Sequence, residues 1–170
     1  MLNTIKSILP GSNGKPPQYL TIINELSKHE DVSEKIESLI WKAYTFGETA
    51  HQGQKRRSGE PYFNHCASVG VILASWNLDV NTIIAGLLHD TVEDTSVTSQ
   101  DIMKEFGPRI AKLVVELTDV SKPEDGNRAV RKGIDRDKLA GVSAEAQTIK
   151  YADLISNGKD IVQNDPKFAK

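Results

Sequence analysis

The sequence predicts an all-α protein that folds as one helical bundle. Apolar residues recur at helical spacing in several segments, and no run alternates apolar and polar residues as a half-buried strand would. Glycine and proline residues separate these segments. The length of 170 residues suits a single domain with a single hydrophobic core.

Residues 1–18 are expected to form a flexible N-terminal arm, and residues 19–170 the folded domain. Residues 10–17, PGSNGKPP, combine helix breakers with small polar residues. The apolar run before them is interrupted by Lys6. It is too short for a signal segment or for the ~20 residues of a membrane span.

The first clear helix is predicted from Val32 to His51. Apolar or small residues recur along it in the i, i+3, i+4, i+7 pattern of an amphipathic helix. These residues are Ile36, Leu39, Ile40, Ala43, Phe46, Gly47 and Ala50. The following residues 52–62, QGQKRRSGEPY, are polar and basic and contain Gly-Glu-Pro, so they predict a loop before a helix that begins near His65.

The segment from Val80 to Leu88 predicts a mostly buried helix. It is apolar without an internal helix breaker, and it runs directly into His89 and Asp90. A buried helix would thus deliver two polar side chains at its C-terminal end, where they require partners.

Two further helices are predicted from their end signals. Thr98 followed by Asp101 resembles a capping box at a helix start. The pair Gly107-Pro108 would end that helix and begin another, which runs through Leu117.

A charged stretch follows, from Ser121 to Arg136, and it contains Pro123 and Gly126. We expect it to separate the preceding helix from the last one, which is predicted over Ser143 to Val162.

Composition and charge exclude several classes of function. The formal net charge is −2 and the isoelectric point about 6.1, so the protein has no overall basic field for binding nucleic acid or acidic membranes. Cys66 is the single cysteine, which excludes an intramolecular disulfide and a cysteine-based zinc cluster. We expect a cytoplasmic protein with no nucleic-acid or membrane partner.

Two imidazoles and two carboxylates are candidates for a single metal site. His89 and Asp90 stand at the end of the buried helix, His65 begins another helix, and Asp153 lies mid-helix among apolar residues. Such mixed nitrogen and oxygen ligands suit a divalent transition ion such as Mn²⁺, Fe²⁺ or Zn²⁺. An isolated His-Asp pair is more often a hydrogen-bonded helix end, so the prediction depends on all four residues together.

Glu93 and Asp94 follow at i+4 from His89 and Asp90, on one side of the helix or its extension. Hydrolysis at a metal ion needs a nearby carboxylate to carry the proton of the attacking water, and these two residues are candidates. The alternative is a solvated acidic helix end.

A basic run is a candidate for binding phosphate or a base. Lys55, Arg56 and Arg57 stand beside Ser58, in the loop that leads to His65. Because this loop must end beside the metal, its guanidinium groups could bind phosphate or stack on a base. The alternative is an ordinary solvated loop.

Asn157 and Asp160 follow Asp153 at i+4 and i+7 and therefore share its helical face. Both residue types are also common on exposed helix surfaces, so each is weak evidence by itself.

Three stretches of the sequence resemble one known family. They are HQGQKRRSGEPYFNH at 51–65, LLHDTVEDT at 87–95 and IKYADLISN at 149–157. Together they resemble the hydrolase domain of the RelA/SpoT stringent-response enzymes over about residues 34–160, most of all the small stand-alone alarmone hydrolases. The pairing of an HDxxED motif with an RxxGxPYxxH motif is highly specific.

The resemblance implies an all-helical HD fold around a single metal site. It implies an enzyme that removes the 3′-pyrophosphate of guanosine tetra- or pentaphosphate (ppGpp or pppGpp), giving GDP or GTP and pyrophosphate. The implied cofactor is one Mn²⁺ ion per chain, held by His65, His89, Asp90 and Asp153. Glu93 and Asp94 would position and deprotonate the attacking water. The residues implied to contact the guanine nucleotide are Arg56, Arg57, Ser58, Asn157 and Asp160.

The sequence also departs from the family pattern. Leu154 and Gly158 stand where long-form members carry a basic residue and a large apolar one, which affects the details of substrate binding. Relatives are expected to carry a closing helix beyond the position of Lys170. Two other functions fit the same residues: a metal-dependent phosphatase acting on another nucleotide such as NADPH, and an HD module that binds nucleotides without catalysis.

Overall fold

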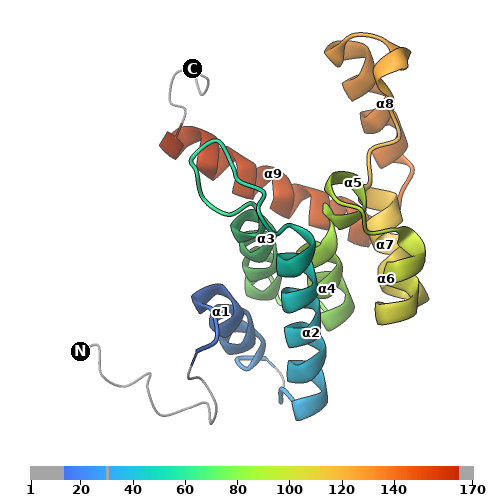
Figure 1. Ribbon diagram of the computed structural model, residues 1–170. Helices are drawn as coiled ribbons and strands as arrows, with labels where there is room; N and C mark the ends of the chain where they lie inside the picture. Colours follow the sequence, from blue (N-terminus) through green and yellow to red (C-terminus); the bar gives the residue numbers. More distant parts are fainter. Residues whose placement is uncertain (1–13, 30, 165–170) are drawn as a thin grey trace.

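The computed structural model describes residues 14–29 and 31–164, and the regular elements in this part of the chain are helices (Figure 1). In chain order they are α1 (Pro17–Leu26), α2 (Glu34–Ala50), α3 (Phe63–Ser75), α4 (Val80–Leu88), α5 (Thr91–Asp94), α6 (Ser99–Phe106), α7 (Pro108–Leu117), the 3₁₀ helix η2 (Pro123–Asp125), α8 (Arg128–Ala140) and α9 (Ala144–Asn164). The predicted all-α fold is confirmed. Among the described helices, none combines the length and apolar character that crossing a membrane requires.

Helix α1 is an element that the sequence pattern did not predict. It begins at Pro17, and proline is favoured in a first helical turn because its missing N–H is not needed there. Its buried residues are Tyr19, Ile22, Ile23 and Leu26, and the helix packs on α3. The predicted arm boundary at residue 18 falls in the first turn of α1, while residues 1–13 of the predicted arm lie outside the described residues.

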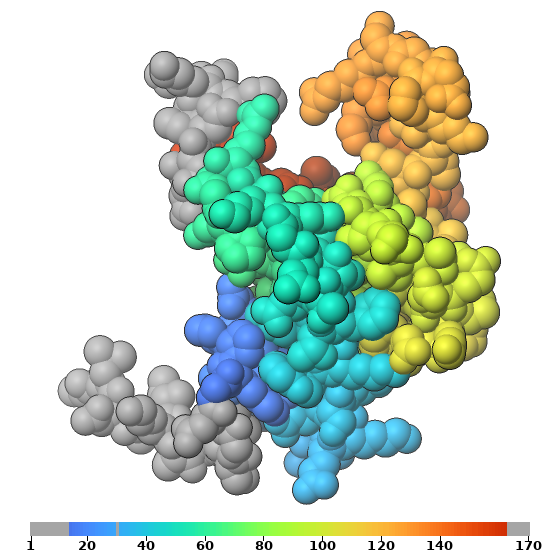
Figure 2. Space-filling model, in the orientation of Figure 1, coloured from blue at the N-terminus to red at the C-terminus, as the bar shows by residue number. Residues whose placement is uncertain are grey.

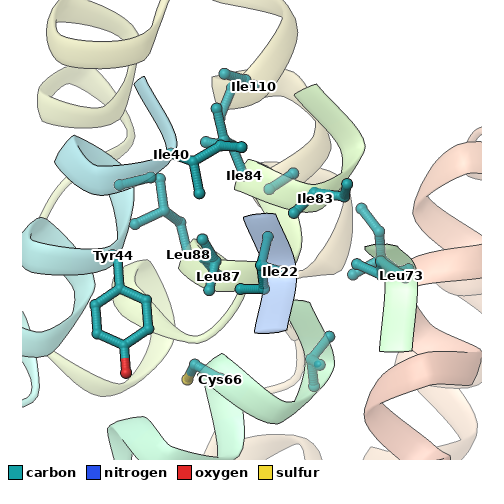
Figure 3. Close-up of a cluster of buried hydrophobic side chains, with 14 of the residues drawn as sticks. Ile22, Ile40, Tyr44, Cys66, Leu73, Ile83, Ile84, Leu87, Leu88 and Ile110 are labelled. Atoms are coloured by element: carbon teal, nitrogen blue, oxygen red, sulfur yellow. The ribbon is translucent and has the colours of Figure 1, made fainter. Parts of the chain in front are cut away.

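Helix α4 is the centre of the hydrophobic core. Every residue from Thr82 to Leu88 is buried, and the helix contacts α2, α3, α7 and α9. Figure 3 shows Ile83, Ile84, Leu87 and Leu88 of α4 in a cluster with core side chains of other helices, among them Ile22, Ile40, Tyr44, Leu73 and Ile110. Burying one such side chain contributes about 1.5–3 kcal/mol. The buried helix predicted from Val80 to Leu88 is confirmed with the same ends.

Local signals set where several helices begin. The Ser33 side chain caps α2, close to the predicted start. Thr98 and Asp101 form the predicted capping box at α6. Gly107 then adopts a φ of 86°, which favours glycine, and α7 begins at Pro108 as predicted.

The expectation that residues 121–136 merely separate two helices was wrong, because α8 begins within them (Figure 1). The single buried residue of α8 is Asp135. Its carboxylate accepts hydrogen bonds from the backbone N–H groups of Val120 and Ser121 at 3.0 and 2.9 Å. Polar contacts rather than a fully buried apolar face hold this helix. The high charge of the stretch, together with Pro123 and Gly126, favoured a linker over a helix in the sequence.

Gly47 lets α2 approach the end of α4. A Cβ atom at this position would lie 2.5 Å from Cε2 of Phe63 and 3.2 Å from the backbone oxygen of Leu87. Phe63 and Leu87 each stand two residues before a candidate metal ligand, His65 or His89. The close packing that supports both ligands therefore depends on glycine at position 47.

We predict that Gly47→Ala lowers the free energy of unfolding by about 1–3 kcal/mol, because the added methyl group must displace Phe63 or the backbone of α4. Gly133→Ala is the matched control, since a Cβ atom at Gly133 of α8 meets nothing within 4 Å. It should raise stability by about 0.5–1 kcal/mol. Urea unfolding followed by circular dichroism measures both, and equal effects would contradict tight packing at Gly47.

Candidate metal centre

The four predicted metal ligands meet at one point, from three parts of the chain. His65 is the third residue of α3, Asp153 lies midway along α9, and His89 and Asp90 stand in the turn between α4 and α5. Nε2 of His65 lies 3.0 Å from Oδ1 of Asp153, and Nε2 of His89 lies 3.1 Å from Oδ1 of Asp90. The ligand atoms of His65, His89 and Asp90 all lie within 4.8 Å of one another.

A break in the helix delivers two of these residues. Helix α4 ends at Leu88, so His89 and Asp90 stand in a turn rather than in a continued helix. Thr91 stabilises the break, because its Oγ1 donates a hydrogen bond to the carbonyl oxygen of Leu88 at 2.6 Å. The turn brings Nε2 of His89 to 3.8 Å from Oδ1 of Asp153 on α9.

One nitrogen of His89 is available for a ligand. Its Nδ1 lies 2.8 Å from the carbonyl oxygen of Gly86, which can only accept, so Nδ1 carries a proton and Nε2 of the neutral ring has a lone pair. Nε2 is buried and has no hydrogen-bond partner among the described residues, although it lies 3.1 Å from Oδ1 of Asp90. A buried nitrogen in this state fits a metal ligand.

Each carboxylate of the cluster has an oxygen bound by a neighbouring side chain. Oη of Tyr62 donates a hydrogen bond to Oδ2 of Asp90 at 2.8 Å. Nζ of Lys150 lies 2.8 Å from Oδ2 of Asp153. These contacts restrict how the two carboxylates turn toward the imidazoles.

Three of the supporting residues were not predicted. Ser156, whose Oγ lies 2.9 Å from Nδ1 of His65, and Lys150 stand at i+3 and i−3 from Asp153. Helical spacing could have identified both. No spacing rule could have predicted the contact of Tyr62, because its partner belongs to another segment.

Burial and mutual attraction set the protonation of the cluster. Burial acts to raise the pKa of Asp153, but the hydrogen bond with His65 and the charges of His89 and Lys150 outweigh it and lower the pKa to about 2. The pKa of Asp90 is likewise held well below its ordinary value against burial, chiefly by His89. Burial acts to lower the pKa of His89, but the two carboxylates raise it to about 9.

The donor set and its charge fit a divalent cation. Two imidazole nitrogens and two carboxylate oxygens are ligand types that divalent transition ions accept. At neutral pH a proton on His89 balances part of the charge of the carboxylates. A cation would replace this proton and compensate both carboxylates, which are otherwise costly to bury.

Glu93 and Asp94 lie on α5 and are accessible to solvent. Oε2 of Glu93 accepts a hydrogen bond from the backbone N–H of Asp119 at 3.0 Å. The pKa of Glu93 is raised, first because neighbouring groups displace water from its carboxylate and then because Asp119, Asp90 and Asp94 repel its charge. A carboxylate in this state is suited to accept a proton.

The predicted basic loop forms a tight turn between α2 and α3. The backbone N–H of Arg56 donates to the carbonyl oxygen of Glu60 at 2.9 Å, and Gly59 adopts a φ of 90°. Arg57 and Ser58 are exposed in this turn. Figure 2 shows a hollow in the molecular surface between this loop and α8, and α9 lies at its floor.

The structure brings Arg56 together with Asn157 and Asp160 on α9. Nε and Nη2 of Arg56 donate to Oδ2 of Asp160 at 3.0 and 2.8 Å, and Nη2 also donates to Oδ1 of Asn157 at 2.8 Å. Arg56 and Asp160 also line a cavity of about 570 Å³, whose wall includes His65 and Ser156. The basic loop and the candidate metal centre are therefore neighbours.

Comparison with known proteins identifies relatives of this chain. A family model described as an HD domain matches residues 43–151. The GTP pyrophosphokinase rsh of Brucella melitensis is 42% identical over 124 residues, which are 71% of this chain and 16% of the relative. The guanosine-3′,5′-bis(diphosphate) 3′-pyrophosphohydrolase of Aquifex aeolicus is 42% identical over 106 residues, 59% of this chain and 15% of the relative. This chain thus spans less than a fifth of the length of these relatives.

Two solved structures are also similar. One is a metazoan ortholog of SpoT that hydrolyses ppGpp, with a TM-score of 0.68 and 31% identity; the match covers 80% of this chain and 75% of that one. The other is a protein of Listeria monocytogenes, with a TM-score of 0.52 and 32% identity, covering 62% and 65% of the two chains.

We predict that the affinity for a divalent cation rises with pH. The raised pKa of His89 means that below about pH 9 an arriving ion must displace a proton from the ring, while the carboxylates stay charged because their pKa values are lowered. Calorimetric titration of chelator-treated protein with Mn²⁺ should show Kd falling up to about tenfold per pH unit between about pH 6.5 and 8. A Kd that does not change with pH would contradict ion binding at His89.

Proposed function

The chain belongs to the HD-domain family, and we propose that it is a metal-dependent hydrolase of ppGpp and pppGpp. The reaction would remove the 3′-pyrophosphate and give GDP or GTP and pyrophosphate. The observation that carries this proposal is the four-ligand cluster with the Arg56 loop at its side. The SpoT ortholog, similar over three quarters of its length, supports the choice of substrate.

His65, His89, Asp90 and Asp153 would hold one divalent ion per chain, and we propose Mn²⁺ as that ion. Mixed imidazole and carboxylate ligands suit Mn²⁺ as they suit Fe²⁺ or Zn²⁺, and the resemblance to the RelA/SpoT hydrolases favours Mn²⁺ among them. When bound, the ion would supply Lewis-acid stabilisation of negative charge on the pyrophosphate.

Glu93 and Asp94 would position the attacking water and take up its proton. The water oxygen forms a bond to the phosphorus next to the 3′ oxygen, the bond between that phosphorus and the 3′ oxygen breaks, and the 3′ oxygen takes a proton. Glu93 is oriented by the backbone N–H of Asp119, and its raised pKa suits it to both accept and return a proton.

Arg56, Arg57 and Ser58 of the loop, with Asn157 and Asp160 of α9, are the proposed contacts of the nucleotide. The edge of the Arg56 guanidinium is bound by the Asp160 carboxylate. Because this carboxylate already pairs with the charge of Arg56, we propose that Arg56 stacks on a base through the flat face of its guanidinium rather than binding phosphate.

The guanine nucleotide is the one partner that we propose. The formal charge of −2 gives no support for a nucleic-acid or membrane partner. A cytoplasmic setting is also part of the proposal, because a chain whose one cysteine is Cys66 does not depend on a disulfide-forming compartment.

We predict Mn²⁺-dependent release of pyrophosphate from ppGpp by this chain. Chelator-treated protein is supplied with Mn²⁺, and the products are resolved by ion-exchange chromatography. His65→Ala and Asp153→Ala should lose both the ion and turnover, because each removes a ligand. Release of phosphate from NADPH with no turnover of ppGpp would replace the proposal with a nucleotide phosphatase. Nucleotide binding without turnover of either substrate would leave a binding module.

We predict that Glu93→Gln and Asp94→Asn retain the ion but lower kcat by about 10²-fold or more, because an amide keeps the shape of the side chain without accepting the proton. Glu48→Gln, at an exposed glutamate of α2, is the matched control and should keep wild-type kcat. Elemental analysis of each purified variant separates the two roles. Loss of the ion from either acidic variant would place that residue among the ligands instead.

A further inference from the structure

The guanidinium of Arg56 is held on one edge by α9. Two of its N–H groups donate to the same oxygen of Asp160, at 3.0 and 2.8 Å. The side chain of Arg56 is only 14% exposed, and that of Asp160 is 26% exposed. Limited contact with water makes this pair stronger than an ion pair on an open surface. It joins the loop before α3 to the last helix.

Asn157 connects this ion pair to the candidate metal centre. Its Oδ1 accepts a hydrogen bond from Arg56, and its Nδ2 donates one to Oδ1 of Asp153 at 2.5 Å. An amide presents its oxygen on one side and its NH₂ group on the other, so the two contacts together determine its orientation. The same Asp153 oxygen lies 3.0 Å from Nε2 of His65.

We propose that Asp160 is a positioning residue for the metal centre. By holding Arg56 against α9, it keeps a donor on Oδ1 of Asn157, and the amide then keeps its NH₂ group on Asp153. This leaves one lone pair of that Asp153 oxygen directed toward the imidazoles, where an ion would bind. An effect of Asp160 on turnover rests on the proposed function, whereas its effect on ion binding does not.

Loss of the Asp160 carboxylate would act through two side chains. Arg56 would be held on α9 by its hydrogen bond to Asn157 alone, and this weaker hold would restrain the rotation of the Asn157 amide less. Asp153 would keep its ion pair with Lys150 through Oδ2. The hydrogen bond from Asn157 that orients Oδ1 would be weakened.

Titration of the full chain with Mn²⁺ in the absence of substrate tests this proposal, with free Mn²⁺ measured by electron paramagnetic resonance. Asp160→Ala and the isosteric Asp160→Asn should each raise Kd by about tenfold, the lower end of the effect of losing a partner of a metal ligand. Glu145→Ala is the matched control, because it removes another carboxylate of α9 that binds an arginine, Arg109, at 2.9 Å. It should leave Kd unchanged.

The proposal is overturned if both Asp160 variants bind Mn²⁺ as the wild type does, or if Glu145→Ala weakens binding equally. Circular dichroism of each variant verifies that it is folded, and Asp160→Asn preserves the volume of the side chain if the alanine variant is unstable.

A double-mutant cycle tests the route through Arg56. In an Arg56→Ala background, Asp160→Ala should change the Kd for Mn²⁺ by less than about twofold, because the contact through which it acts is already lost. A further tenfold loss would overturn this route. Since no substrate is present, these outcomes are independent of ppGpp turnover. If the variants show the expected coupling but the wild-type protein leaves ppGpp intact, only the proposed function is contradicted.

Discussion

Two carboxylates and two imidazoles share one largely buried space, and the surrounding structure makes this burial tolerable. A buried polar group without a partner costs on the order of several kcal/mol when it is charged. Each member of the cluster is therefore bound by a further group. These contacts pair Gly86 with His89, Ser156 with His65, Tyr62 with Asp90 and Lys150 with Asp153. What remains unsatisfied is directed inward, toward the position of a cation.

Polar contacts connect both sides of the hollow in Figure 2, the basic loop and α8, to this cluster and to Glu93 beside it. On the loop side, Arg56 reaches Asp153 through Asn157. On the other side, the backbone N–H of Asp119 binds Glu93, and the next two backbone N–H groups bind Asp135 of α8. Asp135 of α8 thus holds the backbone segment after α7 that orients Glu93, the proposed proton acceptor.

Local patterns predicted much of this structure, and long-range polar contacts were beyond them. The apolar segment from Val80 to Leu88 predicted α4, because a run of this length without a helix breaker indicates a helix buried on most sides. The candidate ligands were predicted from residue types that suit a metal ion, and the fold brings them together. Helix α8 was missed because the stretch in which it begins is highly charged and contains Pro123 and Gly126. The pairing of Arg56 with Asp160 joins positions 104 residues apart. The family resemblance implied a nucleotide contact for both residues, but no sequence pattern predicted that their side chains bind each other.

Binding of one divalent ion by the four side chains is tested most directly by anomalous diffraction. Crystals of the chain grown with Mn²⁺ are measured on both sides of the manganese absorption edge. We expect one anomalous peak per chain, at coordination distances on the order of 2.1 Å from nitrogens of His65 and His89 and oxygens of Asp90 and Asp153. A peak that lies outside this cluster, or a map without a peak at saturating Mn²⁺, would contradict it.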